Sequence, residues 1–330
     1  MKAAFISNSN GIIDRVYSKD AQKYLKEKFD FYDGVYTIHN SCELKDVECI
    51  FSTWGMPAYT NEQIDEYFPK LKIVFYGAGS VQAFARPFLN KGIPVISAWM
   101  ANSVPVVEYS VAQIVLANKG FYQVTNLVNS REGRDKSRAL FETYTGNFNT
   151  KVGLIGLGAI GAGVAEMLKS YKLDVYAYDP FCSEEKAKAL NVTLASLEYI
   201  FENCQTISNH CANLPETRNL LNGALFSKMK KNATFINTGR GAQVVEEDLI
   251  SALKEEPDRT AVLDVTFPEP PEPDSPFYTM KNVFLTPHIA GSAGDECMRM
   301  GDYMADEATR YLNGEPLKYE VTLKMLETMA

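Results

Sequence analysis

The stretch that decides the fold is KVGLIGLGAIGAGVAEMLKSYKLDVYAYD, residues 151–179. It begins with a short apolar run at 152–155, which predicts a buried strand. The glycine-rich turn GLGAIG (156–161) follows, then a segment with apolar side chains at helical spacing, and a second apolar run at 175–178 that ends on Asp179. This order of elements predicts a strand–helix–strand unit of a parallel sheet.

The three glycines of the turn have different expected tasks. Gly156 permits the tight change from strand to helix, Gly158 lets a pyrophosphate approach the backbone, and Gly161 lets helix and strand pack closely. Unpaired N–H groups at the helix N-terminus would then face the phosphates. The turn predicts a dinucleotide site, and the alternative is a strand–helix–strand unit with a purely structural role.

Asp179 ends the second strand, eighteen residues after Gly161. A carboxylate at this distance is placed to accept hydrogen bonds from an adenosine ribose. Pro180 and Phe181 follow, where a protein that binds a 2′-phosphate would carry Arg or Lys. Asp179 would also repel that phosphate, so we expect NAD to be preferred over NADP.

Length and composition limit the classes of function. With 330 residues, 46% of them hydrophobic and 22% charged, the chain has enough apolar material for two ordinary domains. A net charge of −8 argues against partners such as nucleic acid or an anionic membrane. Six scattered cysteines fit reduced thiols better than disulfides or a metal site. Neither a signal peptide nor a membrane span is expected, so we predict a cytoplasmic protein.

Short apolar runs on both sides of the central stretch extend this pattern. The predicted fold is α/β, with two Rossmann-like or flavodoxin-like domains, each built on a parallel sheet. The substrate-binding domain is expected to be discontinuous, with residues 1–98 and 293–330 on either side of an NAD-binding domain at 99–292. The strands expected in the first domain are 3–7, 35–38, 49–52, 73–76 and 95–97. About six strands are expected in the second, including 206–209, 233–237, 261–265 and 283–285. Residues 106–120 and 295–325 have helical patterns.

Polar residues follow three predicted strands of the second domain. They are Arg240, Glu269 and His288. In a parallel sheet, ligands bind beyond the carboxyl ends of the strands. A planar guanidinium can bind a carboxylate through two hydrogen bonds, an imidazole can exchange a hydroxyl proton, and a carboxylate beside the imidazole can orient it. Taken singly, each residue has a plain alternative in a surface ion pair or a solvated loop.

A small-residue turn in the first domain is a candidate anion site. Gly77-Ala78-Gly79 follows a predicted strand and could offer backbone N–H groups to a carboxylate. A tight turn without a ligand explains the same residues equally well.

With these motifs together, the chain resembles the D-isomer-specific 2-hydroxyacid dehydrogenases. The matching segments are GLGAIG (156–161), HCANLPETRNLLN (210–222), INTGRGAQVVEEDL (236–249), AVLDVTFPEP (261–270) and LTPHIAG (285–291). The resemblance implies that Arg240 binds the substrate carboxylate, that His288 is the acid/base and that Glu269 is its partner. It implies further cofactor contacts from Ala159, Ile160, Cys211, Thr238, Gly239 and Asp264. It also implies substrate contacts from Ala78, Gly79 and Asn102, and a homodimer.

The chain departs from the family pattern at two places, and both weaken the transfer of a substrate from the family to this chain. Ala212-Asn213-Leu214 stands where the family usually has Pro-Leu-Thr, and Val81-Gln82-Ala83-Phe84 replaces the usual Asn and Asp after the glycine-rich turn. The loop at 51–67 has no Lys or Arg, which favours a small non-phosphorylated 2-keto acid such as glyoxylate or hydroxypyruvate. The alternatives are a non-catalytic NAD-sensing scaffold, like the corepressors of this fold family, and an enzyme similar to phosphoglycerate dehydrogenase.

Overall fold

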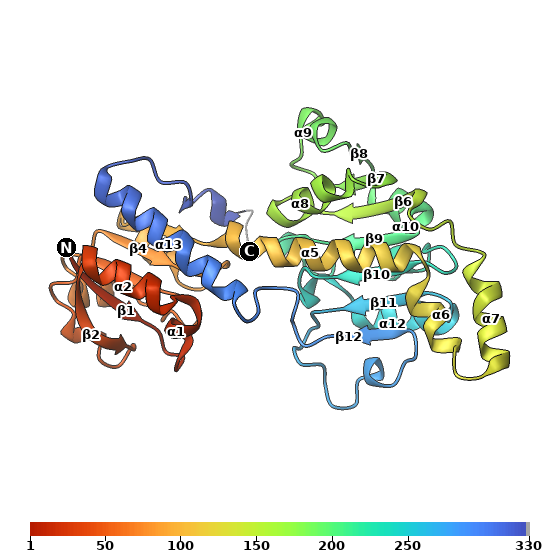
Figure 1. Ribbon diagram of the computed structural model, residues 1–330, viewed down its shortest axis with the longest axis horizontal. Coiled ribbons are helices and arrows are strands. Elements are labelled where there is room, and N and C mark those ends of the chain that lie inside the picture. The colour runs from red at the N-terminus through yellow and green to blue at the C-terminus, as the bar shows by residue number, and fades with distance from the viewer. Residues whose placement is uncertain (328–330) are drawn as a thin grey trace. The chain divides into compact units, whose positions relative to one another are not determined.

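The computed structural model describes residues 1–327 and divides into two compact units (Figure 1). Unit 1 consists of Met1–Ser103 and Ser292–Ala330, and unit 2 is Val104–Gly291. The boundaries expected from the sequence were 98/99 and 292/293. Residues 328–330, the last three of the predicted substrate-binding domain, lie outside the described residues. Which unit binds the substrate stays a prediction.

Unit 2 is built on a seven-stranded sheet in the order β12-β11-β10-β9-β6-β7-β8, and every pair in it is parallel. The strands are β6 (Phe148–Ile155), β7 (Lys172–Tyr178), β8 (Thr193–Leu194), β9 (Thr206–Asn209), β10 (Thr234–Asn237), β11 (Thr260–Leu263) and β12 (Val283–Leu285). The strand order reverses beside β6, where β7 lies on one side and β9 on the other. Ligands of such sheets bind at this reversal. The parallel α/β fold is confirmed, whereas the two-residue strand β8 was not predicted.

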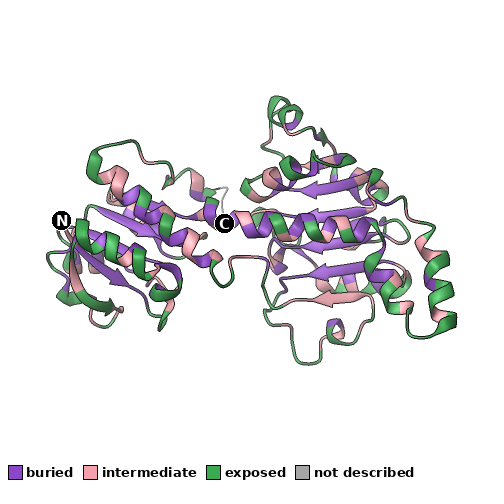
Figure 2. Ribbon diagram, viewed as in Figure 1, coloured by how far each residue is buried: buried purple, intermediate pink, exposed green. Residues whose placement is uncertain are grey.

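Helices cover both faces of this sheet. The helices from α5 to α12 are α5 (Trp99–Asn118), α6 (Phe121–Leu127), α7 (Arg131–Phe141), α8 (Ala159–Leu168), α9 (Glu184–Ala189), α10 (Leu197–Asn203), α11 (Gly223–Phe226) and α12 (Glu246–Glu255), of which α7 packs on α6. Side chains of α5, α6 and α8 join one hydrophobic core, and those of α10, α11 and α12 join a second. The strands between these two cores are buried (Figure 2), which explains why they read as continuous apolar runs. Short 3₁₀ helices lie at Pro215–Thr217, Gly241–Gln243 and Pro276–Tyr278.

By length and composition alone, α5 could cross a membrane, and among the described residues it is the one such helix. Half of its apolar window is buried inside the protein. Ile114 and Ala117 lie in the core of unit 2, and buried Asn118 accepts a hydrogen bond from Thr206 of β9. These contacts describe a core helix. The sequence pattern placed its start at residue 106, seven residues later than the structure does.

Unit 1 has a six-stranded sheet in the order β13-β5-β4-β3-β1-β2. Its strands are β1 (Lys2–Ile6), β2 (Asp30–Tyr36), β3 (Cys49–Ser52), β4 (Ile73–Tyr76), β5 (Val95–Ser97) and β13 (Glu320–Val321). The first five are parallel and have the flavodoxin-like order, whereas β13 pairs antiparallel with β5. The helical prediction for 295–325 was therefore wrong in its second half, because α13 ends at Asn313.

The helices of unit 1 are α1 (Ile12–Val16), α2 (Lys19–Lys28), α3 (Asn61–Tyr67), α4 (Ala85–Asn90) and α13 (Glu296–Asn313), with 3₁₀ turns at Ser41–Glu43 and Met325–Glu327. Helix α13 packs on α1 and α2, and its buried residues Cys297, Met300 and Met304 join the core of the first five strands. The segment after residue 292 is thus part of the same hydrophobic core as the N-terminal strands, which makes unit 1 discontinuous in sequence.

Candidate active site

The glycine-rich turn has the backbone geometry that its sequence predicts. Gly156 has a φ of 90°, and an added Cβ would lie 3.0 Å from the backbone of His210 and Cys211. At Gly161 an added Cβ would lie 1.9 Å from the carbonyl oxygen of Gly156, so only glycine fits there. At Gly158, which precedes α8, an added Cβ would meet nothing within 4 Å. The helix N-terminus therefore faces open space, as a phosphate-binding turn requires.

Asp179 is tied to this turn. Its Oδ2 accepts a hydrogen bond from Leu157 N at 2.7 Å, and its Oδ1 accepts one from Phe181 N at 2.8 Å. Each oxygen keeps a second lone pair that a ribose hydroxyl could use. Lys186 of α9 donates to Leu157 O at 2.7 Å, which places a cation beside the turn. Lys186 lies seven residues after Asp179, farther along the chain than Pro180 and Phe181, so the sequence pattern did not indicate a cation here.

The open space at Gly158 permits a sharp test. We expect Gly158→Ala to leave the melting temperature close to that of the wild type, because the new methyl group meets no protein atom, and yet to weaken NADH binding by obstructing the pyrophosphate. Gly161→Ala should instead destabilise the fold, because its methyl group would overlap the Gly156 carbonyl. Thermal melting and NADH fluorescence titration of both variants decide the matter. Wild-type NADH affinity in a folded Gly158→Ala variant would show that no phosphate lies at this turn.

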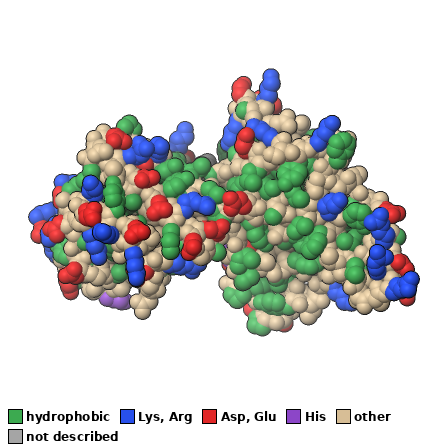
Figure 3. Space-filling model, in the orientation of Figure 1, with side chains coloured by type: hydrophobic (Ala, Val, Ile, Leu, Met, Phe, Trp, Pro, Cys, Tyr) green, Lys and Arg blue, Asp and Glu red, His purple; other side chains and the backbone are tan. Residues whose placement is uncertain are grey.

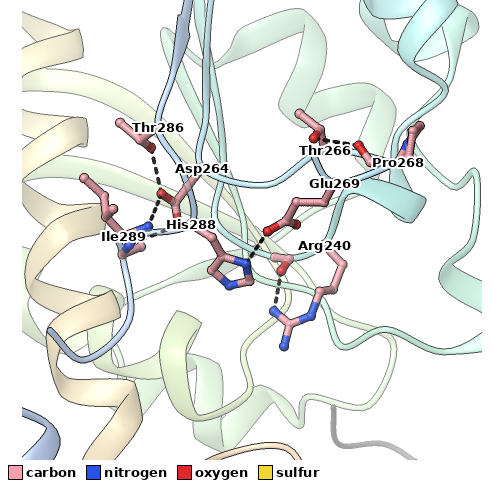
Figure 4. Close-up of polar contacts among 10 residues, drawn as sticks. Arg240, Asp264, Thr266, Pro268, Glu269, Thr286, His288 and Ile289 are labelled. Atoms are coloured by element: carbon pink, nitrogen blue, oxygen red, sulfur yellow. Dashed lines mark hydrogen bonds and ion pairs between the residues drawn. The ribbon is translucent and has the colours of Figure 1, made fainter. Parts of the chain in front are cut away.

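His288 and Glu269 form a close pair at the carboxyl ends of β12 and β11 (Figure 4). Nδ1 of His288 lies 2.6 Å from Oε1 of Glu269, and both side chains remain accessible, at 46% and 41% exposure. The distance is that of a charge-assisted hydrogen bond. Because Nδ1 is used for Glu269, Nε2 is the nitrogen that His288 can offer to a ligand.

The loop that carries His288 is held by Asp264, which is 2% exposed. Its Oδ1 accepts hydrogen bonds from Thr286 Oγ1 and Ile289 N, at 2.7 and 2.8 Å, and its Oδ2 accepts one from Ala290 N at 3.0 Å. His288 itself has a left-handed backbone, with φ 55°. Such a conformation costs on the order of 1–3 kcal/mol and persists only where its surroundings enforce it. Asp264 supplies that constraint.

Arg240 lies next to the His288–Glu269 pair (Figure 4). Burial lowers the pKa of its guanidinium, and the negative charge of Glu269 opposes this shift. Its Nη1 donates to Gly239 O at 2.7 Å. Arg240, Glu269 and His288 thus gather at one edge of the unit 2 sheet, which is the arrangement that the sequence predicted.

The loop with Glu269 has its own anchor. Glu246, at the start of α12, accepts a hydrogen bond from Phe267 N at 2.8 Å, and burial raises the pKa of this carboxyl group. Thr266 donates to Pro268 O at 2.8 Å. An added Cβ at Gly241 would lie 1.9 Å from the carbonyl carbon of Thr266. Glu269 therefore extends from a loop that is packed closely against the segment carrying Arg240.

His210 lies at the end of β9 in a different environment. It is 7% exposed, its Nδ1 is 3.1 Å from Thr238 Oγ1, and burial lowers its pKa to about 3. Burial also raises the pKa of the neighbouring Cys211 thiol to about 12. At neutral pH His210 is therefore a neutral imidazole without the second ring proton of an imidazolium, and the Cys211 thiol keeps its proton.

Residues 111–290 match the family model of the D-isomer specific 2-hydroxyacid dehydrogenase, NAD binding domain. The chain belongs to this dehydrogenase family. Unit 2 therefore has the sequence motifs of an NAD-binding domain. The turn at 156–161, with the open space at Gly158, fits a dinucleotide.

The proteins that are similar to this chain have names that describe different dehydrogenases and reductases. D-3-phosphoglycerate dehydrogenase of Archaeoglobus fulgidus is 32% identical over 72% of this chain and 44% of its own length. Glyoxylate reductase of Korarchaeum cryptofilum is 27% identical over 82% of both chains. The apo structure of Rhodotorula graminis D-mandelate dehydrogenase is 20% identical over 97% of both chains, with a TM-score of 0.79, and shows the shared fold. The chain spans about half the length of the D-3-phosphoglycerate dehydrogenases that it matches.

The family resemblance also assigns substrate contacts in unit 1, and the structure places these residues partly together. An added Cβ at Gly79 would lie 3.2 Å from Asn102 Nδ2, so these two residues are neighbours. Ala78 is fully buried, and its N–H already donates to Tyr76 O at 2.9 Å. This bond leaves Gly79 as the better donor for a carboxylate.

The structure shows a cation beside the loop after β3 that the sequence pattern did not indicate. The guanidinium of Arg15, from α1, lies 6.0 Å from the ring of Trp54, in the loop after β3. The absence of Lys and Arg from residues 51–67 therefore does not make this part of unit 1 free of positive charge.

Proposed function

We propose that the protein reduces a small 2-keto acid to the D-2-hydroxy acid with NADH, and catalyses the reverse reaction with NAD. The observation that carries the proposal is the His288–Glu269 pair at 2.6 Å with Arg240 beside it. A proton donor, the carboxylate that orients it and a cation for the substrate carboxylate are the groups that this reaction needs from the protein. NADH, when bound, supplies the hydride.

In this mechanism Arg240 binds the substrate carboxylate with its planar guanidinium and orients the adjacent carbonyl group. Arg240 is partly buried, and burial, which lowers the pKa of its guanidinium, also makes this contact stronger than it would be in water. Its hydrogen bond to Gly239 O restricts the side chain before substrate arrives.

His288 donates the proton. The carboxylate of Glu269 accepts the Nδ1 hydrogen bond and fixes the ring, so that Nε2 points its hydrogen toward the carbonyl oxygen. In the oxidative direction the neutral imidazole accepts the hydroxyl proton through the same nitrogen. Asp264 keeps the loop of His288 in place throughout.

The residues that would hold the cofactor are those of the turn and its surroundings. Gly158, Ala159, Ile160 and Gly161 would face the pyrophosphate at the start of α8. Gly156, whose N–H donates to Tyr178 O at 2.8 Å, would shape the turn that receives it. Asp179 would accept from the adenosine ribose. Cys211, Thr238, Gly239 and Asp264 would lie toward the nicotinamide end.

Asp179→Ala should narrow the preference for NADH over NADPH. The variant loses both the ribose hydrogen bonds and the repulsion of a 2′-phosphate, while Lys186 remains beside the turn. We expect NADH kcat/KM to fall by roughly tenfold, the equivalent of about one charge-assisted hydrogen bond. Asp174→Ala, an exposed carboxylate in the same strand, is the control and should change neither cofactor's kcat/KM. Equal use of NADH and NADPH by the wild type would contradict this role for Asp179.

The substrate class that we propose is small and non-phosphorylated, with glyoxylate and hydroxypyruvate as the first candidates. The name of the Korarchaeum cryptofilum relative and the apolar side chains of Trp54 and Met56 support it. Arg15 near Trp54 and the D-3-phosphoglycerate dehydrogenase relatives favour a phosphorylated acid instead. NADH oxidation measured with glyoxylate, hydroxypyruvate, pyruvate and 3-phosphohydroxypyruvate separates the two. A kcat/KM that is highest for the phosphorylated acid would reject our choice, and no oxidation with any acid would favour a non-catalytic NAD-sensing scaffold.

We further propose a cytoplasmic homodimer. Hydrophobic side chains gather on the face of unit 2 shown in Figure 3. Leu116, Phe121, Val128 and Phe148 are exposed large hydrophobic residues of this unit. Burying such side chains against a second copy would stabilise a dimer. All six cysteines are free, as in a reducing compartment. A monomeric mass in solution at micromolar concentration would contradict the dimer.

A further inference from the structure

Three buried amide side chains, Asn209, Asn237 and Gln243, form a hydrogen-bonded cluster beside Arg240, and we call it the amide cluster. Their exposures are 0%, 1% and 0%. Asn209 and Asn237 are opposite each other at the carboxyl ends of β9 and β10, and Gln243 lies in the 3₁₀ turn after Arg240. Asn209 Nδ2 donates to Asn237 Oδ1 at 3.0 Å and to Gln243 Oε1 at 2.6 Å.

The amide cluster holds the backbone of Arg240 from both sides. Arg240 N donates to Gln243 Oε1 at 3.1 Å, and Arg240 O accepts from Asn237 Nδ2 at 3.3 Å. Asn237 Oδ1 also accepts from Gly239 N at 3.1 Å. The direction in which the Arg240 side chain leaves the chain is thus fixed by side chains that contact no solvent.

The same cluster holds the loop after β9. Gln243 Nε2 donates to Cys211 O and Ala212 O at 2.9 and 2.8 Å, and Cys211 N donates to Asn209 Oδ1 at 3.2 Å. This loop is where Ala212-Asn213-Leu214 departs from the family's usual Pro-Leu-Thr. Gln243 therefore supplies a side-chain restraint to a segment that lacks the rigid proline.

A local cap explains only part of this arrangement. The bond from Arg240 N to Gln243 is the ordinary cap of a short 3₁₀ turn. The bonds from Asn209, from another strand, and to the carbonyls of residues 211 and 212 are not needed for that turn. An added Cβ at Gly239 would lie 2.6 Å from Gln243 Oε1 and 2.7 Å from Asn209 Nδ2, so the glycine is required by the cluster. A buried polar network whose members are all satisfied is rigid.

We propose that Asn209, Asn237 and Gln243 are positioning residues that hold Arg240 and the loop at 211–212 in one arrangement. The substrate carboxylate and the cofactor are thereby bound in a fixed relation. This inference rests on the proposed function, in which Arg240 binds the carboxylate. Misplacement of a binding group by about 1 Å can cost on the order of 10²-fold in rate.

The test is Gln243→Met, which keeps the length of the side chain and removes its hydrogen bonds. With the keto acid that the wild type reduces best, KM should rise about tenfold, and the Kd of NADH, measured by fluorescence, should rise as well. Gln123→Met is the control. Gln123 is also a buried amide of unit 2, but it bonds Asn232 O and Thr234 Oγ1 at the other end of β10. Its loss should lower the melting temperature without changing KM.

Two further variants separate positioning from stability. In an Arg240→Lys background, Gln243→Met should add little to the rise in KM, because the guanidinium that it positions is gone. Asn209→Leu combined with Gln243→Leu removes the bond between the two amides but leaves the backbone groups of Arg240, Cys211 and Ala212 without these partners, so its melting temperature should fall. Below that melting temperature, where the variant is folded, KM should still rise. Unchanged KM and NADH Kd in these folded variants, or an undiminished effect in the lysine background, would overturn the inference. If the wild type reduces no acid, the proposed function fails, and the NADH Kd alone then decides whether the cluster holds the loop.

Discussion

His288→Asn is expected to lower kcat by roughly 10²–10⁴, the usual contribution of a general acid, while the Kd of NADH stays near its wild-type value. Asparagine can still accept or donate a hydrogen bond at this position, but it cannot transfer a proton at neutral pH. Stopped-flow or steady-state reduction of the best keto acid, combined with NADH fluorescence titration, measures both quantities.

His39→Asn is the matched control, because His39 is exposed in unit 1 and should leave kcat unchanged. His210 is the only other histidine. It is buried, and burial lowers its pKa to about 3, so it carries no imidazolium proton to donate near neutral pH. If His288→Asn kept more than about a tenth of wild-type kcat, the proton would have to come from another group, and the proposed mechanism would be wrong.

Most strands could be predicted from sequence because buried parallel strands are short runs rich in apolar residues. The prediction for β2 was wrong in its start, which lies at Asp30 and not at residue 35, because this strand is largely exposed. The bounds of β3, β4, β5, β9 and β12 agree with the predicted ranges. The two-residue strands β8 and β13 could not be predicted in this way, because a strand of that length has no periodicity. Glu320 and Val321 become a strand only by pairing with β5. No helix was predicted for residues 121–141 either, where α6 and α7 lie, because the charged run at 131–136 interrupts any clear apolar periodicity.

The candidate site could be predicted as far as chemistry follows from residue type and place along a strand. Arg240, Glu269 and His288 each follow a strand, and a parallel sheet brings such positions to one edge. What the sequence could not show is which polar side chains turn inward. Asp264 fits a cofactor contact by motif, yet in the structure it also holds the loop of His288. Gln243 and Asn209 are 34 residues apart, and they become hydrogen-bond partners only once β9 and the 3₁₀ turn after β10 lie side by side in the fold.

Arg240→Lys tests the other half of the mechanism and should chiefly raise KM for the keto acid. An ammonium group is a point charge and cannot reproduce two parallel hydrogen bonds to a carboxylate. Loss of one charge-assisted hydrogen bond, about 1.5–3 kcal/mol, corresponds to a rise of roughly 10- to 100-fold. We expect the Kd of NADH to stay near its wild-type value, because no predicted cofactor contact is changed.

Arg259→Lys is the control for this substitution. Arg259 is 8% exposed and donates to the carbonyl oxygens of Ser227, Met229 and Ala252. Arg259→Lys also removes a guanidinium from unit 2, but its hydrogen bonds go to backbone carbonyl groups and not to Glu269 or His288. The substitution should therefore lower the melting temperature and leave KM for the keto acid unchanged. The two variants together distinguish a guanidinium that binds substrate from one that supports the fold. A KM that rises equally in both would mean that Arg240 acts through stability, and that the substrate carboxylate is bound by other groups, such as the backbone N–H of Gly79.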